Sequence, residues 1–192
     1  MGMIDQLSSI SAFILAGGKS SRMGSDKGLL HWHGNTFAER IYHELKKCFV
    51  DVQIIANHEA YRSLPMPVCA DLFPNCGPLG GIYTACTQAK TPFFFIVACD
   101  MPLVTADSVL YFLSQCRNIP LNIAVVEKQQ HPLFALYDTS LQTDLLAALQ
   151  NEEYKLLDFI QQKNYYCVEM LRFADELRNI NTPLDFENLS KE

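Results

Sequence analysis

Short apolar runs alternate with segments of helical periodicity along most of the chain. Residues 12–16 and 50–56 have the length and apolar content of buried strands. Residues 93–98 are apolar at every position, as in strands that are covered on both faces. Between these runs, residues 36–49 and 78–89 place apolar side chains three or four positions apart, which predicts amphipathic helices.

The second half of the chain continues this alternation and contains more helix. Thr105 is placed to cap a helix that ends near residue 116, and Thr182 followed by Pro183 marks a later helix start. The remaining predictions are strands at 68–70, 123–126, 133–137 and 165–170 and helices at 141–149 and 155–162. This order predicts an α/β fold with a mostly parallel sheet and helices on both faces.

The composition fits one well-packed domain, which we expect to span residues 1–192. Hydrophobic residues make up 49% of the 192 residues and charged residues 19%, with no linker or internal repeat. The net charge of −6 argues against a nucleic-acid partner. The seven cysteines include no Cys-x-x-Cys pair, which favours reduced thiols in a cytoplasmic enzyme over disulfides or a zinc site. No apolar run is long enough to span a membrane.

The strongest chemical signal is a glycine-rich segment, residues 15–27, directly after the first predicted strand. Lys19, Arg22 and Lys27 fall within nine residues of a chain that has only 15 Lys and Arg. Glycines let backbone N–H groups approach an anion, and ligands of open parallel sheets bind beyond the carboxyl ends of strands. These features favour a polyphosphate site over an incidental turn. The segment has no Gly-x-Gly-x-x-Gly, and Phe13 stands where a P-loop needs glycine.

A carboxylate, Asp100, follows the most apolar of the predicted strands, residues 93–98. An unpaired charge in such a place is costly, and Mg²⁺ held by one or two carboxylates plus substrate phosphates would compensate it. Taken alone, Asp100 reads as a turn or capping residue before Pro102. Together with the glycine-rich segment, it favours a metal site.

The motif Leu-Ala-Gly-Gly-x-x-x-Arg-Met-Gly-x-Asp-Lys at residues 15–27 closely resembles the nucleotidyltransferases of molybdenum cofactor assembly, specifically the molybdenum cofactor guanylyltransferase family. Further matches follow in order over nearly the whole chain: Asn57, Asp71, Gly77-Pro78-Leu79-Gly80-Gly81-Ile82, Cys99-Asp100-Met101-Pro102, His131-Pro132 with Phe134-Ala135-Leu136, and Asn179-Ile180-Asn181-Thr182-Pro183. The resemblance implies a three-layer, Rossmann-like nucleotidyltransferase fold. Its nucleotide-binding half would span about 11–104 and its acceptor-binding half about 105–192.

The family's activity is the transfer of GMP from GTP to molybdopterin, and the resemblance implies the same reaction here, with Mg²⁺ as cofactor. The implied catalytic residues are Arg22, Lys27 and Asp100, and Asp100 is the implied metal ligand. The implied nucleotide-binding residues are Leu15, Ala16, Gly17, Gly18, Lys27, Asn57, Asp71 and Asp100. The implied acceptor-binding residues are His131, Asn179 and Asn181. Molybdoenzymes or other cofactor-assembly proteins would be the protein partners.

Several of these residues have ordinary structural explanations when they are read without the resemblance. Asn57 and Asp71 suit turns, and the glycines of residues 77–81 suit close packing of a helix on a sheet. His131 reads as a loop histidine, and the asparagines near residue 180 suit a helix cap. The chain also departs from the family at Asn151-Glu152-Glu153-Tyr154-Lys155, where relatives often carry a Gly-Glu-Arg-Arg-like stretch. We expect Lys155 to compensate in part for the two missing basic residues.

Three alternatives to guanylyl transfer stay open at this stage. A molybdopterin cytidylyltransferase or a sugar-phosphate nucleotidyltransferase shares the glycine-rich segment but usually has alanine at the position of Gly17. A catalytically inactive nucleotide-binding regulator, a different class, would be expected to have lost Lys27 or Asp100, and both are present. A redox enzyme that binds a dinucleotide would need the fingerprint that is missing here.

Overall fold

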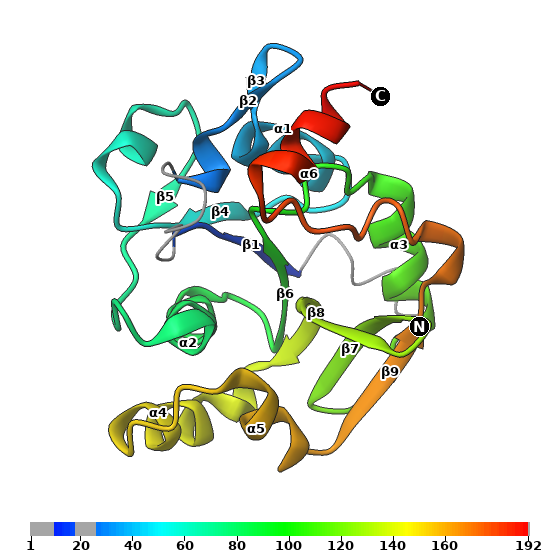
Figure 1. Ribbon diagram of the computed structural model, residues 1–192. Coiled ribbons are helices and arrows are strands. Elements are labelled where there is room, and N and C mark those ends of the chain that lie inside the picture. Colours follow the sequence, from blue (N-terminus) through cyan, green and yellow to red (C-terminus); the bar gives the residue numbers. More distant parts are fainter. Residues whose placement is uncertain (1–9, 18–25, 192) are drawn as a thin grey trace.

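Seven strands form one sheet in the computed structural model, which describes residues 10–17 and 26–191 (Figure 1). Their order across the sheet is β5-β4-β1-β6-β8-β7-β9. The strands are β1 (Ser11–Leu15), β4 (Val52–Ile55), β5 (Val68–Cys69), β6 (Phe93–Ala98), β7 (Leu121–Val126), β8 (Gln129–Asp138) and β9 (Tyr165–Glu169). Only β8 runs antiparallel to its neighbours, so the predicted α/β fold with a mostly parallel sheet is confirmed.

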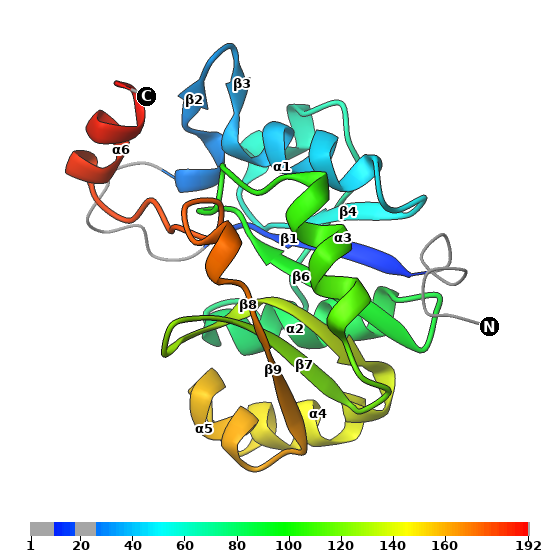
Figure 2. The same cartoon turned by 90° about the vertical axis from the view of Figure 1, so that its right-hand side faces the viewer.

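Helices cover both faces of this sheet and make three layers (Figure 2). They are α1 (Phe37–Lys46), α2 (Gly77–Gln88), α3 (Ala106–Gln115), α4 (Gln142–Gln150), α5 (Leu156–Gln161) and α6 (Pro183–Leu189). Side chains of α1 and α3 join the core on one face, and those of α2, α4 and α5 join the core on the other. Within the described residues, no helix combines the length and the apolar character needed to cross a bilayer.

Strand β6 contributes alternate side chains to the cores on the two faces of the sheet. Phe94 and Ile96 pack with α2, α4 and α5, whereas Phe95 and Val97 pack with α1 and α3. All four side chains are completely buried. Burial of such a side chain stabilises the fold by roughly 1.5–3 kcal/mol, so this strand holds the layers together. The prediction of a strand covered on both faces is confirmed.

A small hairpin of β2 (His31–Trp32) and β3 (Asn35–Thr36) was not predicted from the sequence. Its turn places His33 and Gly34 at φ values of 48° and 84°. The hairpin lies beside α6, at the other end of the chain (Figure 1). Phe37 is buried in a separate apolar cluster here, and Phe186 packs against it with ring centroids 5.9 Å apart. The cluster therefore anchors the C-terminal helix on the N-terminal part of the molecule.

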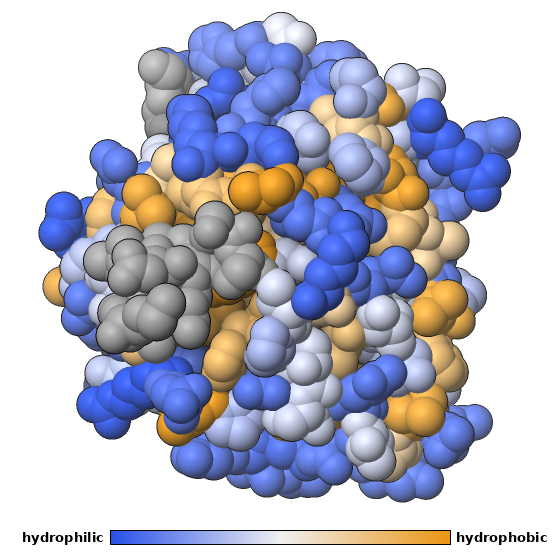
Figure 3. All heavy atoms as spheres, turned by 180° about the vertical axis from the view of Figure 1, so that it is seen from behind, coloured by the Kyte–Doolittle hydropathy of each residue, from blue (hydrophilic) through white to orange (hydrophobic). Residues whose placement is uncertain are grey.

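Polar side chains cover much of the surface seen from behind, with apolar ones scattered among them (Figure 3). Several large hydrophobic side chains are exposed, and they belong to different parts of the chain: Val50, Leu72, Leu110, Tyr154, Leu157, Leu171 and Leu184. Scattered apolar residues of this kind are normal on protein surfaces and carry no functional argument by themselves.

Two glycines of α2, Gly80 and Gly81, pack closely against Phe73 and Leu15, so substitutions at these glycines test the fold. A Cβ atom on Gly80 would lie 2.3 Å from the carbonyl oxygen of Phe73, which is backbone and cannot move easily. A Cβ atom on Gly81 would lie 3.2 Å from the end of the flexible Leu15 side chain. We predict that Gly80→Ala lowers the free energy of unfolding by roughly 1–3 kcal/mol. Gly81→Ala is the matched control and should cost much less, because Leu15 can shift and alanine favours the helix.

Urea unfolding of the two variants measures the difference. Equal stabilities of the two variants would contradict the packing described for α2.

Candidate active site

Asp100 lies just beyond the carboxyl end of β6, and residues from both ends of the chain contact it. Its Oδ2 atom is 3.3 Å from Nζ of Lys27. Its Oδ1 atom accepts a hydrogen bond from Nδ2 of Asn179 at 2.8 Å, and its backbone oxygen accepts one from N–H of Ile180 at 2.8 Å. Lys27 also donates to Oδ1 of Asn181. We call these four side chains, Lys27, Asp100, Asn179 and Asn181, the Asp100 network.

The ion pair of the Asp100 network is only partly open to solvent, whereas Asn181 is exposed. The side chain of Lys27 is 18% exposed and that of Asp100 is 17% exposed. The carboxylate therefore has a cation and an amide as partners within the protein, and its burial alone does not require a metal ion. What the network does provide is an ammonium group and two kinds of oxygen ligand, carboxylate and amide, at one point on the sheet edge.

A second polar group forms at the ends of the neighbouring strands β4 and β5. Oδ1 of Asn57 accepts from the backbone N–H of Asp71 at 3.0 Å. Oδ1 of Asp71 accepts from the backbone N–H of Phe73 and from Oγ1 of Thr84, each at 3.0 Å. Thr84 belongs to α2 and is completely buried. The two predicted nucleotide-contact residues, Asn57 and Asp71, thus lie together, and a helix side chain orients one of them.

The structure describes only the first part of the glycine-rich segment. Leu15 ends β1, and Ala16 is buried, with its N–H bonded to the carbonyl of Ile55 at 2.9 Å. Gly17 is exposed and has a φ of 112°, which favours glycine, so its lack of a side chain is explained by the turn itself. Among the described residues, no atom lies within 4 Å of the position that a Cβ atom on Gly17 would take. Gly18 and Arg22 lie outside the described residues.

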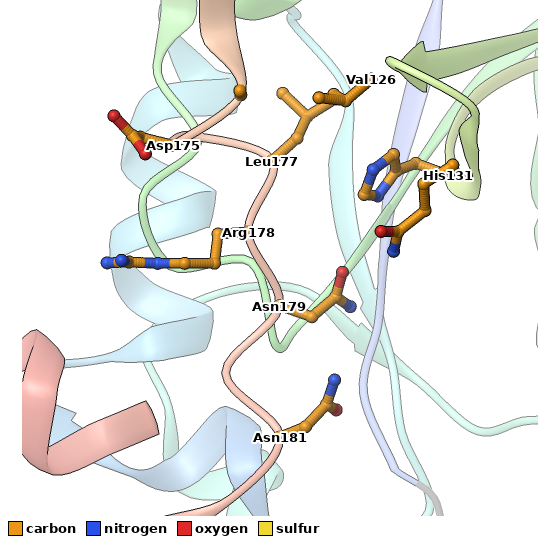
Figure 4. Close-up of a pocket in the computed structure, with 9 residues that line it drawn as sticks. Val126, His131, Asp175, Leu177, Arg178, Asn179 and Asn181 are labelled. Atoms are coloured by element: carbon orange, nitrogen blue, oxygen red, sulfur yellow. The ribbon is translucent and has the colours of Figure 1, made fainter. Parts of the chain in front are cut away.

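The three predicted acceptor-binding residues, His131, Asn179 and Asn181, line one pocket of about 530 Å³ (Figure 4). The other lining residues are Val126, Gln129, Ala174, Asp175, Leu177 and Arg178. Figure 4 shows Asn179 and Asn181 directed toward the side on which His131 lies, whereas Arg178 extends the other way. Because Asn179 also contacts Asp100, the pocket adjoins the Asp100 network.

His131 is not the loop residue that its neighbours in the sequence indicate. It lies in β8, pairs with Ala124 of β7 and is 7% exposed. Burial holds the pKa of His131 below its ordinary value of 6.5. The imidazole is therefore neutral at pH 7 and offers one hydrogen-bond donor and one acceptor to the pocket.

Residues 151–155, the segment that departs from the family pattern, lie outside the pocket of His131. The carbonyl oxygen of Tyr154 is 3.7 Å from the position of a Cβ atom on Gly77, so this segment adjoins the start of α2. The Lys155 side chain is 86% exposed and lies 4.0 Å from Asp158. Of the described residues that line the pocket with His131, none comes from this segment.

Sequence reasoning missed two residues that hold the predicted ones in place. Thr84 orients Asp71, and the hydroxyl of Tyr61 donates to the side chain of Asp26, next to Lys27. Both contacts join segments that are distant in the sequence, so no local pattern marks them. The sequence offers one indication of such residues, which is a tyrosine or threonine at a position where the apolar pattern predicts a core residue.

Comparison with known proteins identifies the family. Residues 12–165 match the model of the MobA-like NTP transferase domain. The chain belongs to the MobA-like NTP transferase family. The matched range includes Lys27, Asp100 and His131, together with the group of Asn57 and Asp71. It ends before Asn179 and Asn181. The C-terminal part of the Asp100 network therefore lies beyond the range that the family model covers.

Relatives of this MobA-like chain match it over nearly its full length. A molybdenum cofactor guanylyltransferase of Pasteurella multocida is 36% identical, covering 92% of this chain and 97% of the relative. The crystal structure of a protein from Aquifex aeolicus is 32% identical with a TM-score of 0.80, covering 92% of this chain and 96% of that one. Molybdopterin-guanine dinucleotide biosynthesis protein A from Archaeoglobus fulgidus has a TM-score of 0.81 at 19% identity, covering 95% and 97%, and supports the fold.

Proposed function

We propose that this protein transfers GMP from GTP to molybdopterin and releases pyrophosphate, as a molybdenum cofactor guanylyltransferase. The observation that carries the proposal is the position of the Asp100 network between the carboxyl edge of the parallel strands and the pocket of His131. A nucleotide at the strand ends and an acceptor in the pocket would meet at Lys27 and Asp100. The full-length relative of that name supports the identity of the two substrates.

The proposed reaction needs few protein groups. An oxygen of the acceptor's terminal phosphate attacks the α-phosphorus of GTP, a new P–O bond forms, and the bond to the pyrophosphate oxygen breaks. No general base is needed, because the attacking phosphate is already ionised. The Lys27 ammonium stabilises the charge that develops on the phosphate oxygens, and Arg22 is proposed to assist it. The absence of a side chain at Gly17 would let the nucleotide approach the backbone at the sheet edge closely.

The residues present fit a magnesium ion. Within residues 10–17 and 26–191, no cluster of three or more His, Cys, Asp or Glu side chains is arranged to hold a metal. A single carboxylate, Asp100, with the amide oxygen of Asn181 nearby, suits Mg²⁺, which usually takes one or two protein oxygens and completes its coordination with water and substrate phosphates. When bound, the ion would neutralise negative charge on the phosphates.

The division of the sheet is consistent with two functional halves. Strands β5, β4, β1 and β6 come from residues 11–104, which we propose as the nucleotide-binding half. Strands β8, β7 and β9 come from residues 105–192, which we propose as the acceptor-binding half. The boundary between them is the antiparallel pairing of β6 with β8. Asp100 lies close to that boundary, where both substrates would be within reach.

We also propose that the enzyme works in the cytoplasm and passes its product to molybdoenzymes or to other cofactor-assembly proteins. The seven cysteines are all free thiols, which fits a reducing compartment. The alternative of an inactive nucleotide-binding regulator is disfavoured, because Lys27 and Asp100 are both retained and lie 3.3 Å apart.

The role of Asp100 can be tested with a matched carboxylate. We predict that Asp100→Asn nearly abolishes transfer while the fold survives, because the variant loses the charge that holds Mg²⁺ and pairs with Lys27. Asp51→Asn is the control, since Asp51 pairs with Lys90 at the same distance, 3.3 Å, at the amino end of the neighbouring strands. Magnesium titrations of the transfer rate compare the variants. An Asp100→Asn enzyme with unchanged rate and metal dependence would contradict the assignment.

The lysines of the same two ion pairs, Lys27 and Lys90, give a second matched comparison. We predict that Lys27→Ala lowers turnover by roughly 10²- to 10³-fold, as expected for the loss of one group that stabilises developing charge. Lys90→Ala removes the lysine of the ion pair at the opposite edge and should leave turnover near that of the wild type. Steady-state kinetics with both variants measures the difference. Similar turnover in the two variants would place the phosphates elsewhere.

The base preference separates the guanylyl assignment from its nearest alternative. We predict that GTP is preferred over CTP and ATP by roughly ten- to a hundredfold, because a mismatched base edge leaves buried polar groups unpaired. Gly17 stands where cytidylyl relatives usually have alanine, and the absence of a side chain there would let a larger purine approach the backbone closely. Direct competition of the three nucleotides with magnesium and molybdopterin tests this. CTP incorporation equal to or above that of GTP would overturn guanylyl transfer but leave nucleotidyl transfer intact.

A further inference from the structure

Tyr61 is a completely buried tyrosine whose hydroxyl points at the segment that carries Lys27. It lies in the 3-10 helix η3 (Glu59–Ser63), after β4, and donates to Oδ1 of Asp26. Phenylalanine would fill the same apolar space without burying a hydroxyl, and a buried hydroxyl is costly unless it is bonded. Burial raises the pKa of Tyr61, so the hydroxyl keeps its proton and remains a donor.

The same carboxylate oxygen shapes the turn that begins at Lys27. Oδ1 of Asp26 also accepts the backbone N–H of Gly28 at 3.1 Å and so caps the 3-10 helix η2 (Lys27–Leu29). Two backbone bonds complete this turn, from Leu29 to Asp26 and from Leu30 to Lys27, each at 3.1 Å. Lys27 is therefore the first residue of a turn whose cap is fixed by Tyr61.

Gly28 is shaped to the same hydroxyl. It is buried, and a Cβ atom added to it would lie 2.2 Å from Oη of Tyr61 and 3.2 Å from the Cβ atom of Cys99. Its φ is not in the region that requires glycine, so close packing against Tyr61 explains why no side chain fits here. Tyr61, Asp26 and Gly28 thus form one interlocked unit at the base of Lys27.

We infer that Tyr61 is a positioning residue for nucleotidyl transfer, acting through Asp26 and the turn at Gly28 to hold Lys27 against Asp100. The inference rests on the proposed function for its chemistry and on the three contacts above for its geometry. Lys27 contacts Asp100 and Asn181 from this turn, so a change in the cap moves the ammonium group that stabilises the phosphates. The hydroxyl of Tyr61 bonds to Asp26 and so would act through Lys27 rather than on the substrate.

The first test removes only the hydroxyl. Tyr61→Phe is expected to lower kcat by roughly 10- to 100-fold, as displacement of a catalytic group by about an ångström does, with little change in KM for the nucleotide. Tyr137→Phe is the matched control, because Tyr137 is also completely buried and its hydroxyl donates to the carbonyl of Pro132 at 2.8 Å. It should lose stability but keep kcat. A Tyr61→Phe variant that loses stability and keeps its kcat would overturn the inference.

Two double variants test whether Tyr61 acts through Lys27. In a Lys27→Ala background, Tyr61→Phe should cause no further loss of turnover, since the group that it positions is gone. Gly28→Ala alone should lose activity, because its Cβ atom collides with the hydroxyl, and adding Tyr61→Phe should restore part of it. Fully additive losses in both double variants would contradict positioning through this turn.

An exchange measurement separates this inference from the proposed function. Kinetics are measured with whichever nucleoside triphosphate the wild type uses best, so the inference does not depend on guanine. Hydrogen exchange of the Gly28 amide needs no activity, and it should be faster in Tyr61→Phe than in the wild type or in Tyr137→Phe. If the wild type transfers no nucleotide, the proposed function fails and the exchange result still decides whether Tyr61 fixes the turn. Equal exchange rates of the Gly28 amide in Tyr61→Phe and in the wild type would overturn the inference that Tyr61 positions Lys27.

Discussion

The carboxylate of Asp100 lies just beyond the buried strand β6, and a partly buried charge there needs partners. Those partners come from positions 73 and 79 residues away, Lys27 and Asn179. The C-terminal segment that carries Asn179 and Asn181 thereby contacts both Asp100 and Lys27. The contact of Phe37 with Phe186 holds α6, which follows this segment, against α1. The Asp100 network thus joins Lys27, from the first part of the chain, to Asn179 and Asn181, from the last part, at the end of β6.

Local pattern was sufficient for the elements that carry strong local signals. β6 was predicted with its observed ends because its six residues form an unbroken apolar run that begins after Pro92. The caps at Thr105 and Thr182 were predicted because a hydroxyl before a helix satisfies its first N–H groups, and both form capping boxes in the structure. The hairpin around Gly34 was missed, since two-residue strands give no periodicity. The antiparallel direction of β8 was also not predicted, because strand direction depends on the path of the connection.

The candidate site shows the same division between local and distant information. Asp100 and Lys27 could be selected from their places after apolar strands, and the resemblance added Asn57, Asp71 and the residues of the pocket. The structure brings these residues together at one edge, but their roles toward substrates stay predictions. Tyr61 could not be found in the same way, because its hydroxyl meets Asp26 across 35 residues and its apolar ring satisfies the core pattern by itself. The residues that position a site are less visible in a sequence than the residues that form it.

The central claim is that GTP binds at the carboxyl edge of β1, β4 and β6 with its phosphates at the Asp100 network. A crystal structure of the protein with Mg²⁺ and a non-hydrolysable GTP analogue tests it most directly. The account predicts the phosphates between Gly17 and Lys27, with the metal on the Asp100 carboxylate and the pocket of His131 left for the acceptor. A nucleotide bound elsewhere, or at this edge with its phosphates directed away from Lys27 and Asp100, would contradict the account.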